Sequence, residues 1–289
     1  MAHLTIRQRK NSCEVNNLST YVIADVHGCY SEFIELLRKV RFSEDDRLIV
    51  AGDIIDRGRE SYAMLQWMEK KFDNVDFIMG NHDRMFVESV AKLADFSKVS
   101  ANIKEAYREV KMYDPNFDRY KTIRDLIRDH GVGLATLIKW AKIIKNFPYT
   151  IDLNINGRDY IVVHAGYMEE GDLKDTDIDL SPILSSMEKP MSEQKYFYLW
   201  AREEALIVGG KEDTTIIAGH TPTIADSEFY TGGTVFKYEN KEKNSVIYDI
   251  DCGCVFHGKI PGANLACIRL EDEQVFYLYE KKPDTYYYV

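Results

Sequence analysis

The sequence predicts an α/β fold, and two observations support this prediction. Several short runs of apolar or β-branched residues end at polar clusters that contain glycine, which is typical of buried strands that run into loops. Segments with the periodicity of amphipathic helices lie between these runs, and alternation of strands and helices is typical of an α/β core. The expected strands are residues 21–24, 48–51, 77–79, 160–163, 214–218 and 246–248.

The first helix is expected between the first two strands, over residues 31–40. Its apolar side chains recur with the spacing of one helix face, and Ser31 is a residue type that caps helix N-termini. The apolar stripe consists of Phe33, Ile34, Leu36, Leu37 and Val40.

A change of pattern from about residue 84 to about residue 147 predicts a helical insertion. Charged, helix-favouring segments occupy 103–112 and 122–144, with Pro115 as a break, and we expect them over or beside the functional site. The C-terminal third is rich in Tyr, Val and Thr, which predicts antiparallel strands joined by turns such as Gly232-Gly233. No repeat or linker divides the chain, so a single domain is expected over residues 1–289.

The charge balance argues against two classes of partner. With 37 basic and 47 acidic side chains the formal net charge is −10, which disfavours binding to nucleic acid polymers or to anionic membranes. No apolar stretch approaches the roughly 18 residues that span a bilayer, and the polar N-terminus lacks the apolar core of a signal peptide. An odd number of cysteines fits reduced thiols, so a cytoplasmic protein is expected. The cysteines are Cys13, Cys29, Cys252, Cys254 and Cys267.

Polar side chains that can bind metals follow five of the expected strands. In an open α/β sheet, ligands gather at the carboxyl ends of strands, so these side chains can converge on one crevice. They are Asp25 with His27, Asp53 with Asp56 and Arg57, Asn81 with His82, His164, and His220.

This mixture of imidazole and carboxylate ligands suits Mn²⁺, Fe²⁺ or Zn²⁺. Two such ions that share a carboxylate, about 3.5–4 Å apart, lower the pKa of the water between them and hold the attacking and leaving oxygens of a displacement. Arg57, and Arg202 in Leu199-Trp200-Ala201-Arg202, can offer guanidinium groups to phosphate oxygens. The sequence therefore predicts hydrolysis of a phosphate ester.

Five motifs between residues 25 and 221 resemble, in this order, the phosphoprotein phosphatase group of calcineurin-like metallophosphoesterases. They are Asp25-Val26-His27-Gly28, Gly52-Asp53-Ile54-Ile55-Asp56-Arg57-Gly58, Gly80-Asn81-His82-Asp83, His164-Ala165-Gly166 and Gly219-His220-Thr221. The resemblance implies a four-layer α/β/β/α sandwich with the metals at one edge. It also implies catalysis by a hydroxide that bridges two divalent ions, with Mn²⁺ preferred and Fe²⁺ or Zn²⁺ accepted.

The same resemblance implies a role for each residue of these motifs. Asp53 would bridge the two metals, Asp25 and His27 would bind the first, and the second would be bound by Asn81, His164 and His220. His82 would be the general acid that protonates the leaving group, oriented by Asp56. The phosphate would be bound by Arg57, Arg202 and Asn81.

Departures from the family pattern remove no implied ligand. Ala24 stands where glycine is common, and Asp83 stands where glutamate is common. His164-Ala165-Gly166 and residues 199–202 resemble the bacterial phosphatase and dinucleoside-tetraphosphatase branches. Residues 251–255, Asp-Cys-Gly-Cys-Val, resemble the segment after the last ligand and are expected to line the site.

Three functions are compatible with these motifs. The first is a serine/threonine protein phosphatase that acts on a phosphorylated protein or a small phosphate ester, and the second is a symmetrical bis(5'-nucleosyl)-tetraphosphatase. We favour the first because no basic or aromatic cluster in the sequence marks a nucleotide pocket. The third, an inactive binding module, is disfavoured because the implied acid His82 and the implied bridge Asp53 are both present.

Overall fold

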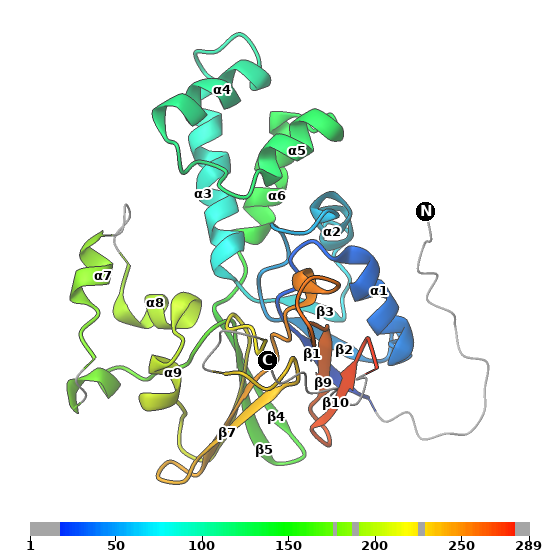
Figure 1. Ribbon diagram of the computed structural model, residues 1–289, viewed down its shortest axis with the longest axis vertical. Helices are drawn as coiled ribbons and strands as arrows, with labels where there is room; N and C mark the ends of the chain where they lie inside the picture. Colours follow the sequence, from blue (N-terminus) through cyan, green and yellow to red (C-terminus); the bar gives the residue numbers. More distant parts are fainter. Residues whose placement is uncertain (1–17, 176–177, 187–190, 225–228, 281–289) are drawn as a thin grey trace, which may run out of the picture.

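Two five-stranded β-sheets pack against each other in the computed structural model, which describes residues 18–175, 178–186, 191–224 and 229–280 (Figure 1). Apolar side chains of both sheets form a shared core, including Val22, Ile49, Val162, Ile217 and Ile268. Helices cover the outer face of each sheet, so that the molecule has helix, sheet, sheet and helix layers. The α/β prediction is confirmed in this four-layer form.

The first sheet has the strand order β10-β9-β1-β2-β3. Its strands are β1 (Thr20–Ile23), β2 (Arg47–Val50), β3 (Val75–Phe77), β9 (Ala266–Arg269) and β10 (Gln274–Tyr277). β1, β2 and β3 are parallel, whereas β9 is antiparallel to both of its neighbours. The carboxyl ends of the three parallel strands therefore lie at one edge of the sheet.

The second sheet has the order β4-β5-β6-β8-β7. Its strands are β4 (Thr150–Ile155), β5 (Arg158–Val163), β6 (Thr214–Ala218), β7 (Phe236–Asn240) and β8 (Ser245–Asp249). β5, β6 and β8 are parallel, and the edge strands β4 and β7 are antiparallel to their neighbours. All six strands expected individually from the sequence are present in the two sheets.

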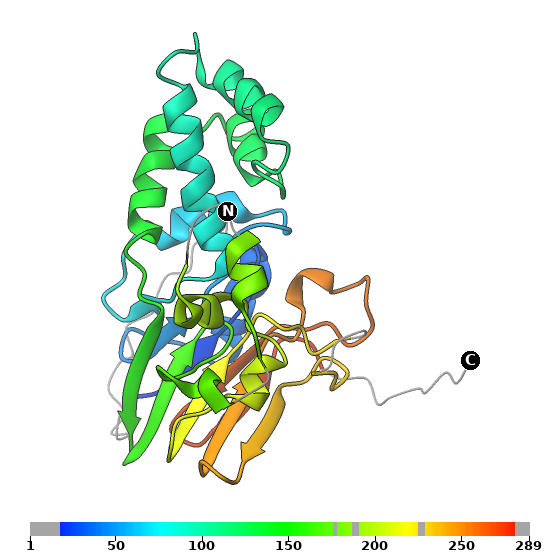
Figure 2. The ribbon, with the colours of Figure 1, turned by 90° about the vertical axis from the view of Figure 1, so that its left-hand side faces the viewer.

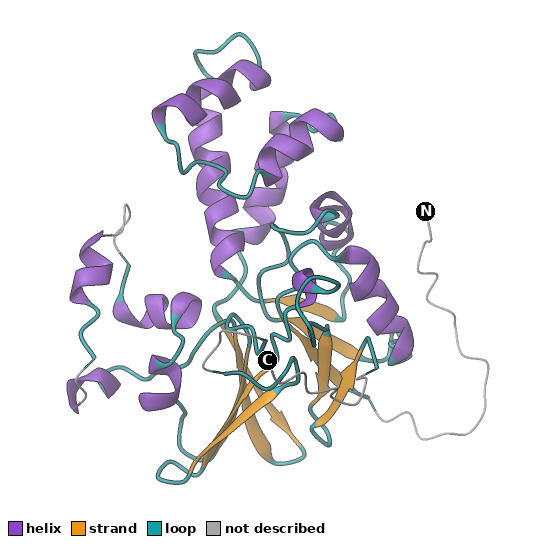
Figure 3. Ribbon diagram, in the orientation of Figure 1, coloured by secondary structure: helices purple, strands orange, loops and turns teal. Residues whose placement is uncertain are grey.

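Helices pack on both outer faces of the sheets (Figure 3). On the first sheet, α1 and α2 bury Phe33 and Met64 against strand residues such as Ile23 and Leu48. On the second sheet, Tyr198 of α8 packs on Ile161 and its neighbours. The α-helices are α1 (Tyr30–Lys39), α2 (Ser61–Met68), α3 (Asn81–Phe96), α4 (Ile103–Tyr113), α5 (Thr122–Asp129), α6 (Leu134–Ile144), α7 (Ser181–Ser186), α8 (Glu193–Trp200) and α9 (Glu204–Ile207). Two short 3₁₀ helices are η1 (Asp172–Asp175) and η2 (Cys254–Phe256).

The expected helical insertion consists of α3 to α6 and projects away from the sheets at one end (Figure 2). Its first helix starts at Asn81, so the expected boundary at residue 84 falls inside α3. The single helix expected over 122–144 is divided into α5 and α6 by Gly131-Val132-Gly133. Gly131 has a φ of +64°, a conformation that ends helices and that glycine adopts at low cost.

Two other local expectations were wrong. Ser31 is not an N-cap, because α1 already begins at Tyr30 and the Ser31 hydroxyl donates to Glu60 Oε1 at 2.7 Å. Gly232-Gly233 is not a turn between two paired strands. It lies in the connection from β6 to β7, and these two strands are not neighbours in the sheet. The turn between β7 and β8 is formed by residues 241–244 instead.

Candidate metal centre

The side chains expected to bind metals converge at the carboxyl ends of the parallel strands of both sheets. Asp25, Asp53 and Asn81 follow β1, β2 and β3, whereas His164 and His220 follow β5 and β6. A backbone bond joins the two groups, because His220 N donates to Asp25 Oδ2 at 2.8 Å. The converging residues are all buried, with at most 7% of each exposed, and comprise Asp25, His27, Asp53, Asn81, His164 and His220.

Much of this site is held in an uncommon backbone conformation. Six of the residues singled out in the sequence have positive φ: Asp25 (52°), His27 (45°), Asp53 (52°), Asp56 (71°), Arg57 (64°) and His220 (73°). Non-glycine residues rarely adopt this conformation, and they keep it where the surrounding structure imposes it, often at functional sites. Hydrogen bonds such as His27 N to Asp53 O, at 2.8 Å, link these loops to one another.

The histidines are arranged as neutral metal ligands. His27 Nδ1 lies 3.0 Å from Ile55 O, and since a carbonyl only accepts, Nδ1 carries the hydrogen. His27 Nε2 then has a lone pair available for a metal ion, and this atom lies 3.5 Å from Asp53 Oδ2. Burial lowers the pKa of His27 well below its usual value and the pKa of His164 to about 3, so both rings are neutral at pH 7.

His164 faces an oxygen on each side. Its Nδ1 lies 3.0 Å from Ala51 O and its Nε2 lies 3.0 Å from Asn81 Oδ1. A neutral imidazole has one hydrogen and can donate to only one of these oxygens. With Nδ1 donating to Ala51, the lone pairs of His164 Nε2 and Asn81 Oδ1 point into the same space, as two ligands of one cation would.

Among the described residues, the buried polar atoms without a hydrogen-bond partner include two in the ligand cluster, Asp25 Oδ1 and His220 Nε2. Such atoms cost free energy unless something pairs with them. Burial raises the pKa of Asp25, and the carboxylates of Asp251 and Asp53 raise it further, so cations would stabilise the ionised forms.

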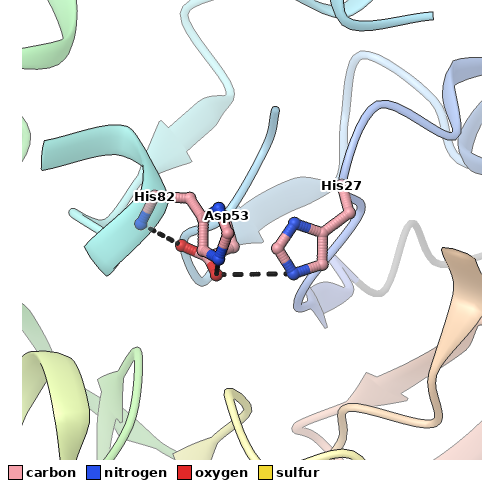
Figure 4. Close-up of side chains that lie close together, drawn as sticks. All are labelled: His27, Asp53 and His82. Atoms are coloured by element: carbon pink, nitrogen blue, oxygen red, sulfur yellow. Dashed lines mark hydrogen bonds and ion pairs between the residues drawn. The ribbon is translucent and has the colours of Figure 1, made fainter. Parts of the chain in front are cut away.

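Asp53 is common to two groups of potential ligands. The first group is His27, Asp53 and His82, and the second is Asp53, His164 and His220, with the ligand atoms of each group within 4.8 Å of one another (Figure 4). Figure 4 shows that the Asp53 carboxylate interacts with both His82 and His27, since His82 N donates to Asp53 Oδ1 at 2.9 Å and His27 Nε2 lies near Asp53 Oδ2. The donor set therefore fits two divalent ions with Asp53 between them.

His82 has partners that favour another role than metal binding. Its Nδ1 lies 2.8 Å from Asp56 Oδ2, and its Nε2 lies 3.2 Å from Arg57 Nη2. The guanidinium of Arg57 would compete with a metal ion for the lone pair of this Nε2. Burial lowers the pKa of His82, whereas the hydrogen bond to Asp56 opposes this shift. A histidine held by a carboxylate in this way can exchange a proton at Nε2.

Arg202 contacts the loop that contains His220. Its Nη1 donates to His220 O at 3.4 Å and to Thr221 Oγ1 at 3.3 Å. Its side chain is exposed and forms an ion pair with no carboxylate of the described residues. The structure thus brings Arg57 and Arg202 to the metal-ligand cluster from different elements.

Three further residues contribute to the site, and none of them was assigned a role from the sequence. The buried Asp83 accepts hydrogen bonds from Asp53 N at 2.8 Å and Gly80 N at 3.1 Å, and burial raises its pKa to about 7. Asp83 thus caps the start of α3, and an acidic residue in the first turn of a helix is a signal that could have identified this role. The hydroxyl of Thr122 donates to Asp56 Oδ1, and the Tyr120 ring centroid lies 4.4 Å from that of His82.

The expectation that residues 251–255 line the site agrees with the position of Asp251. This buried carboxylate is close enough to Asp25 to raise its pKa. Cys252 and Cys254 of the same segment are buried, as are Cys29 and Cys267, while Cys13 lies outside the described residues. No helix in the described part of the chain is long and apolar enough to cross a membrane.

The family model described as calcineurin-like phosphoesterase matches residues 18–258. The chain belongs to this family. This calcineurin-like chain is therefore a metallophosphoesterase, a hydrolase that acts on phosphoric esters and that uses divalent metal ions.

Three curated relatives of this calcineurin-like protein have the name symmetrical bis(5'-nucleosyl)-tetraphosphatase. The protein of Shigella dysenteriae serotype 1 (strain Sd197) is 30% identical over 299 residues, which cover 90% of this chain and 94% of that one. That of Marinomonas sp. (strain MWYL1) is 24% identical over 90% of this chain and 96% of its own length. That of Buchnera aphidicola subsp. Baizongia pistaciae (strain Bp) is 39% identical over 84 residues, which cover only 29% of this chain and 30% of that one.

Proposed function

We propose that the protein cleaves dinucleoside tetraphosphates symmetrically, with water, into two nucleoside diphosphates. The observation that carries this proposal is the similarity, over nine-tenths of the chain, to two proteins named as symmetrical tetraphosphatases. It replaces our preference for a serine/threonine phosphatase, which depended on the lack of a basic or aromatic cluster in the sequence. In three dimensions Arg57, Arg119 and Tyr120 do form such a cluster beside His82.

We assign the metal ligands as the resemblance implied them. One ion would be held by Asp25, His27 and Asp53, and the other by Asp53, Asn81, His164 and His220. The neutral histidines and the unpartnered atoms Asp25 Oδ1 and His220 Nε2 support this assignment. We propose Mn²⁺ as the ion, since mixed imidazole and carboxylate ligands suit it. Such ions supply water of lowered pKa and neutralise the charge of phosphate oxygens.

The remaining residues would bind the substrate and transfer a proton. His82 would protonate the leaving oxygen at Nε2, because Asp56 holds its Nδ1 and stabilises the cationic ring. Arg57 and Arg202 would hold the cleaved phosphate, with Asn81 at its edge. Since the start of α5 reaches Asp56 through Thr122, the insertion closes one side of the site, which favours a small substrate over a folded phosphoprotein.

A comparison of substrates tests the proposal. Mn²⁺-loaded protein is assayed on diadenosine tetraphosphate and on a phosphoserine peptide, with chelator-treated protein as control, and the nucleotide products are separated. We expect a clear preference for the dinucleotide, with ADP as the only nucleotide product. Preference for the peptide would restore the phosphatase hypothesis, and formation of ATP with AMP would contradict symmetrical cleavage.

A further inference from the structure

The turn between α4 and α5 contacts the proposed acid and its partners. Tyr120 packs on the His82 ring, and Arg57 Cζ lies 5.6 Å from the centroid of the Tyr120 ring. Thr122, two residues further along, donates to the carboxylate of Asp56. Since His82 would protonate the leaving oxygen, this turn lies on the side of the site from which the leaving group departs.

The turn is fixed in place by a buried carboxylate. Asp118 accepts hydrogen bonds from Ile123 N at 3.0 Å, from Arg124 N at 2.9 Å and from Tyr107 Oη at 2.8 Å. Asp118 and Lys121 have positive φ, 46° and 66°, and Lys121 N bonds back to Asp118 O at 2.9 Å. Capping of α5 would explain the hydrogen bonds of Asp118. It would not explain why the next two residues, Arg119 and Tyr120, lie near His82.

Arg119 is the charged residue next to Tyr120 in this turn. Its side chain is exposed, and no carboxylate of the described residues forms an ion pair with it. Its Cζ lies 6.0 Å from the centroid of the Tyr120 ring, so Tyr120 lies within cation–π distance of both Arg57 and Arg119. Arg119 and Tyr120 also line a hollow of about 140 Å³, together with Asp56 and with charged residues that include Lys92, Asp114 and Asp118. A guanidinium group held in this way is suited to bind a phosphate with two parallel hydrogen bonds.

We propose that Arg119 binds the phosphates of the leaving nucleoside diphosphate, with Tyr120 as the residue that positions it, and this inference rests on the proposed function. In symmetrical cleavage a water oxygen bonds to one of the two central phosphorus atoms, and the bond from that phosphorus to the bridging oxygen breaks. The bridging oxygen leaves on a nucleoside diphosphate and takes the proton of His82, while the proton of the water passes to solvent. The nucleoside diphosphate is a multiply charged leaving group, whereas the aryl alcohol that leaves from an aryl phosphate carries no phosphate. Arg119 should therefore favour the dinucleotide over an aryl phosphate.

The test compares two substrates in the Mn²⁺-loaded full chain. Arg119→Gln should lower kcat/KM on diadenosine tetraphosphate roughly 10- to 100-fold, the loss of a hydrogen bond between charged groups. Hydrolysis of p-nitrophenyl phosphate should change less than about twofold, because its leaving group does not reach Arg119. Arg108→Gln removes the same charge from an exposed position on α4 and should leave both substrates unaffected. An equal loss on both substrates, or no loss on the dinucleotide, would overturn the inference.

Binding of ADP separates this inference from the proposed function. Calorimetry of the Mn²⁺-loaded protein with ADP and with inorganic phosphate requires no turnover. We expect Arg119→Gln to raise the Kd for ADP about tenfold or more and to leave the Kd for inorganic phosphate unchanged. If wild type failed to cleave the dinucleotide, the proposed function would be wrong. If the Kd for ADP were equal in wild type and Arg119→Gln, the proposed role of Arg119 would be wrong, whatever the outcome of the cleavage assay.

Discussion

At the scale of single residues, the position of Asp53 depends on a glycine. Gly80 is packed so closely that a Cβ there would lie 2.2 Å from Asp53 Oδ1 and 2.3 Å from Asp53 N. Asp83 holds the same region, because it accepts from the amides of both Gly80 and Asp53. The residue proposed to bridge the metals is thus held by the start of α3, and no larger side chain fits at Gly80.

We predict that Gly80→Ala weakens metal binding and activity. The added methyl group must displace Asp53, which should cost about 1–3 kcal/mol of stability and reduce Mn²⁺ affinity at least tenfold. Gly133→Ala is a matched control, since Gly133 is the N-cap of α6 with φ −85° and ψ 164°, against −92° and 166° for Gly80. A Cβ at Gly133 meets nothing within 4 Å. Calorimetric titration with Mn²⁺ would contradict the prediction if the two variants bound the ion equally.

Residues of the site were predictable where their signal is local. Asp25, Asp53 and His164 each lie within about three residues of a strand end, so the motif and the strand end identify them together. Thr122 lies 66 residues from Asp56 in the chain, and neither residue type nor spacing announces that contact. The cluster of Arg57, Arg119 and Tyr120 was missed for the same reason, because Arg57 is distant in sequence from the other two. The sequence therefore showed no cluster that favoured a nucleotide substrate.

At the scale of elements, one carboxylate joins α6 to the end of α2. Glu69, at the end of α2, accepts hydrogen bonds from Lys139 Nζ and from the indole of the buried Trp140. The break at Gly131 makes this contact possible, because it turns α6 back along α3. The sequence pattern supported helices on both sides of this break, and only the glycines indicated that they are separate.

Glu69→Gln should change the pH dependence of stability. The hydrogen bonds from Lys139 and Trp140 lower the pKa of Glu69 in the folded state. A lowered folded pKa means that the stabilisation is present above the unfolded value of about 4.3 and is lost as pH falls through the folded pKa. We expect Glu69→Gln to reduce the free energy of unfolding by up to about 1 kcal/mol at pH 7 and by less at pH 3.5.

Urea unfolding at both pH values measures this difference. Glu44→Gln, at an exposed position, makes the same change of charge and should leave stability nearly unchanged. A difference between wild type and Glu69→Gln of equal size at pH 7 and pH 3.5 would show that the charge of Glu69 contributes nothing.

At the scale of the whole molecule, the metal centre lies across the junction of the two sheets. β1, β2 and β3 of the first sheet lead to Asp25, Asp53 and Asn81, while β5 and β6 of the second lead to His164 and His220. The strands were predictable from their apolar runs, but their division into two sheets was implied only by the family resemblance. Ions bound here would join the sheets at the edge where their carboxyl ends meet.

Because both sheets contribute ligands, metal binding should stabilise the entire fold and not only the loops of the site. Binding to the folded state alone contributes about 2.7 kcal/mol at 100 times Kd, which corresponds to a rise in Tm of roughly 4–5 °C for a chain of this size. We expect Mn²⁺ to produce such a rise in calorimetric scans, EDTA to reverse it, and Asp53→Asn to lose most of it. Asp45→Asn, the same substitution at an exposed position, should retain the full rise. If Asp53→Asn gained as much as wild type, Asp53 could not be the ligand shared by the two ions, and the link between the sheets would depend on the histidines alone.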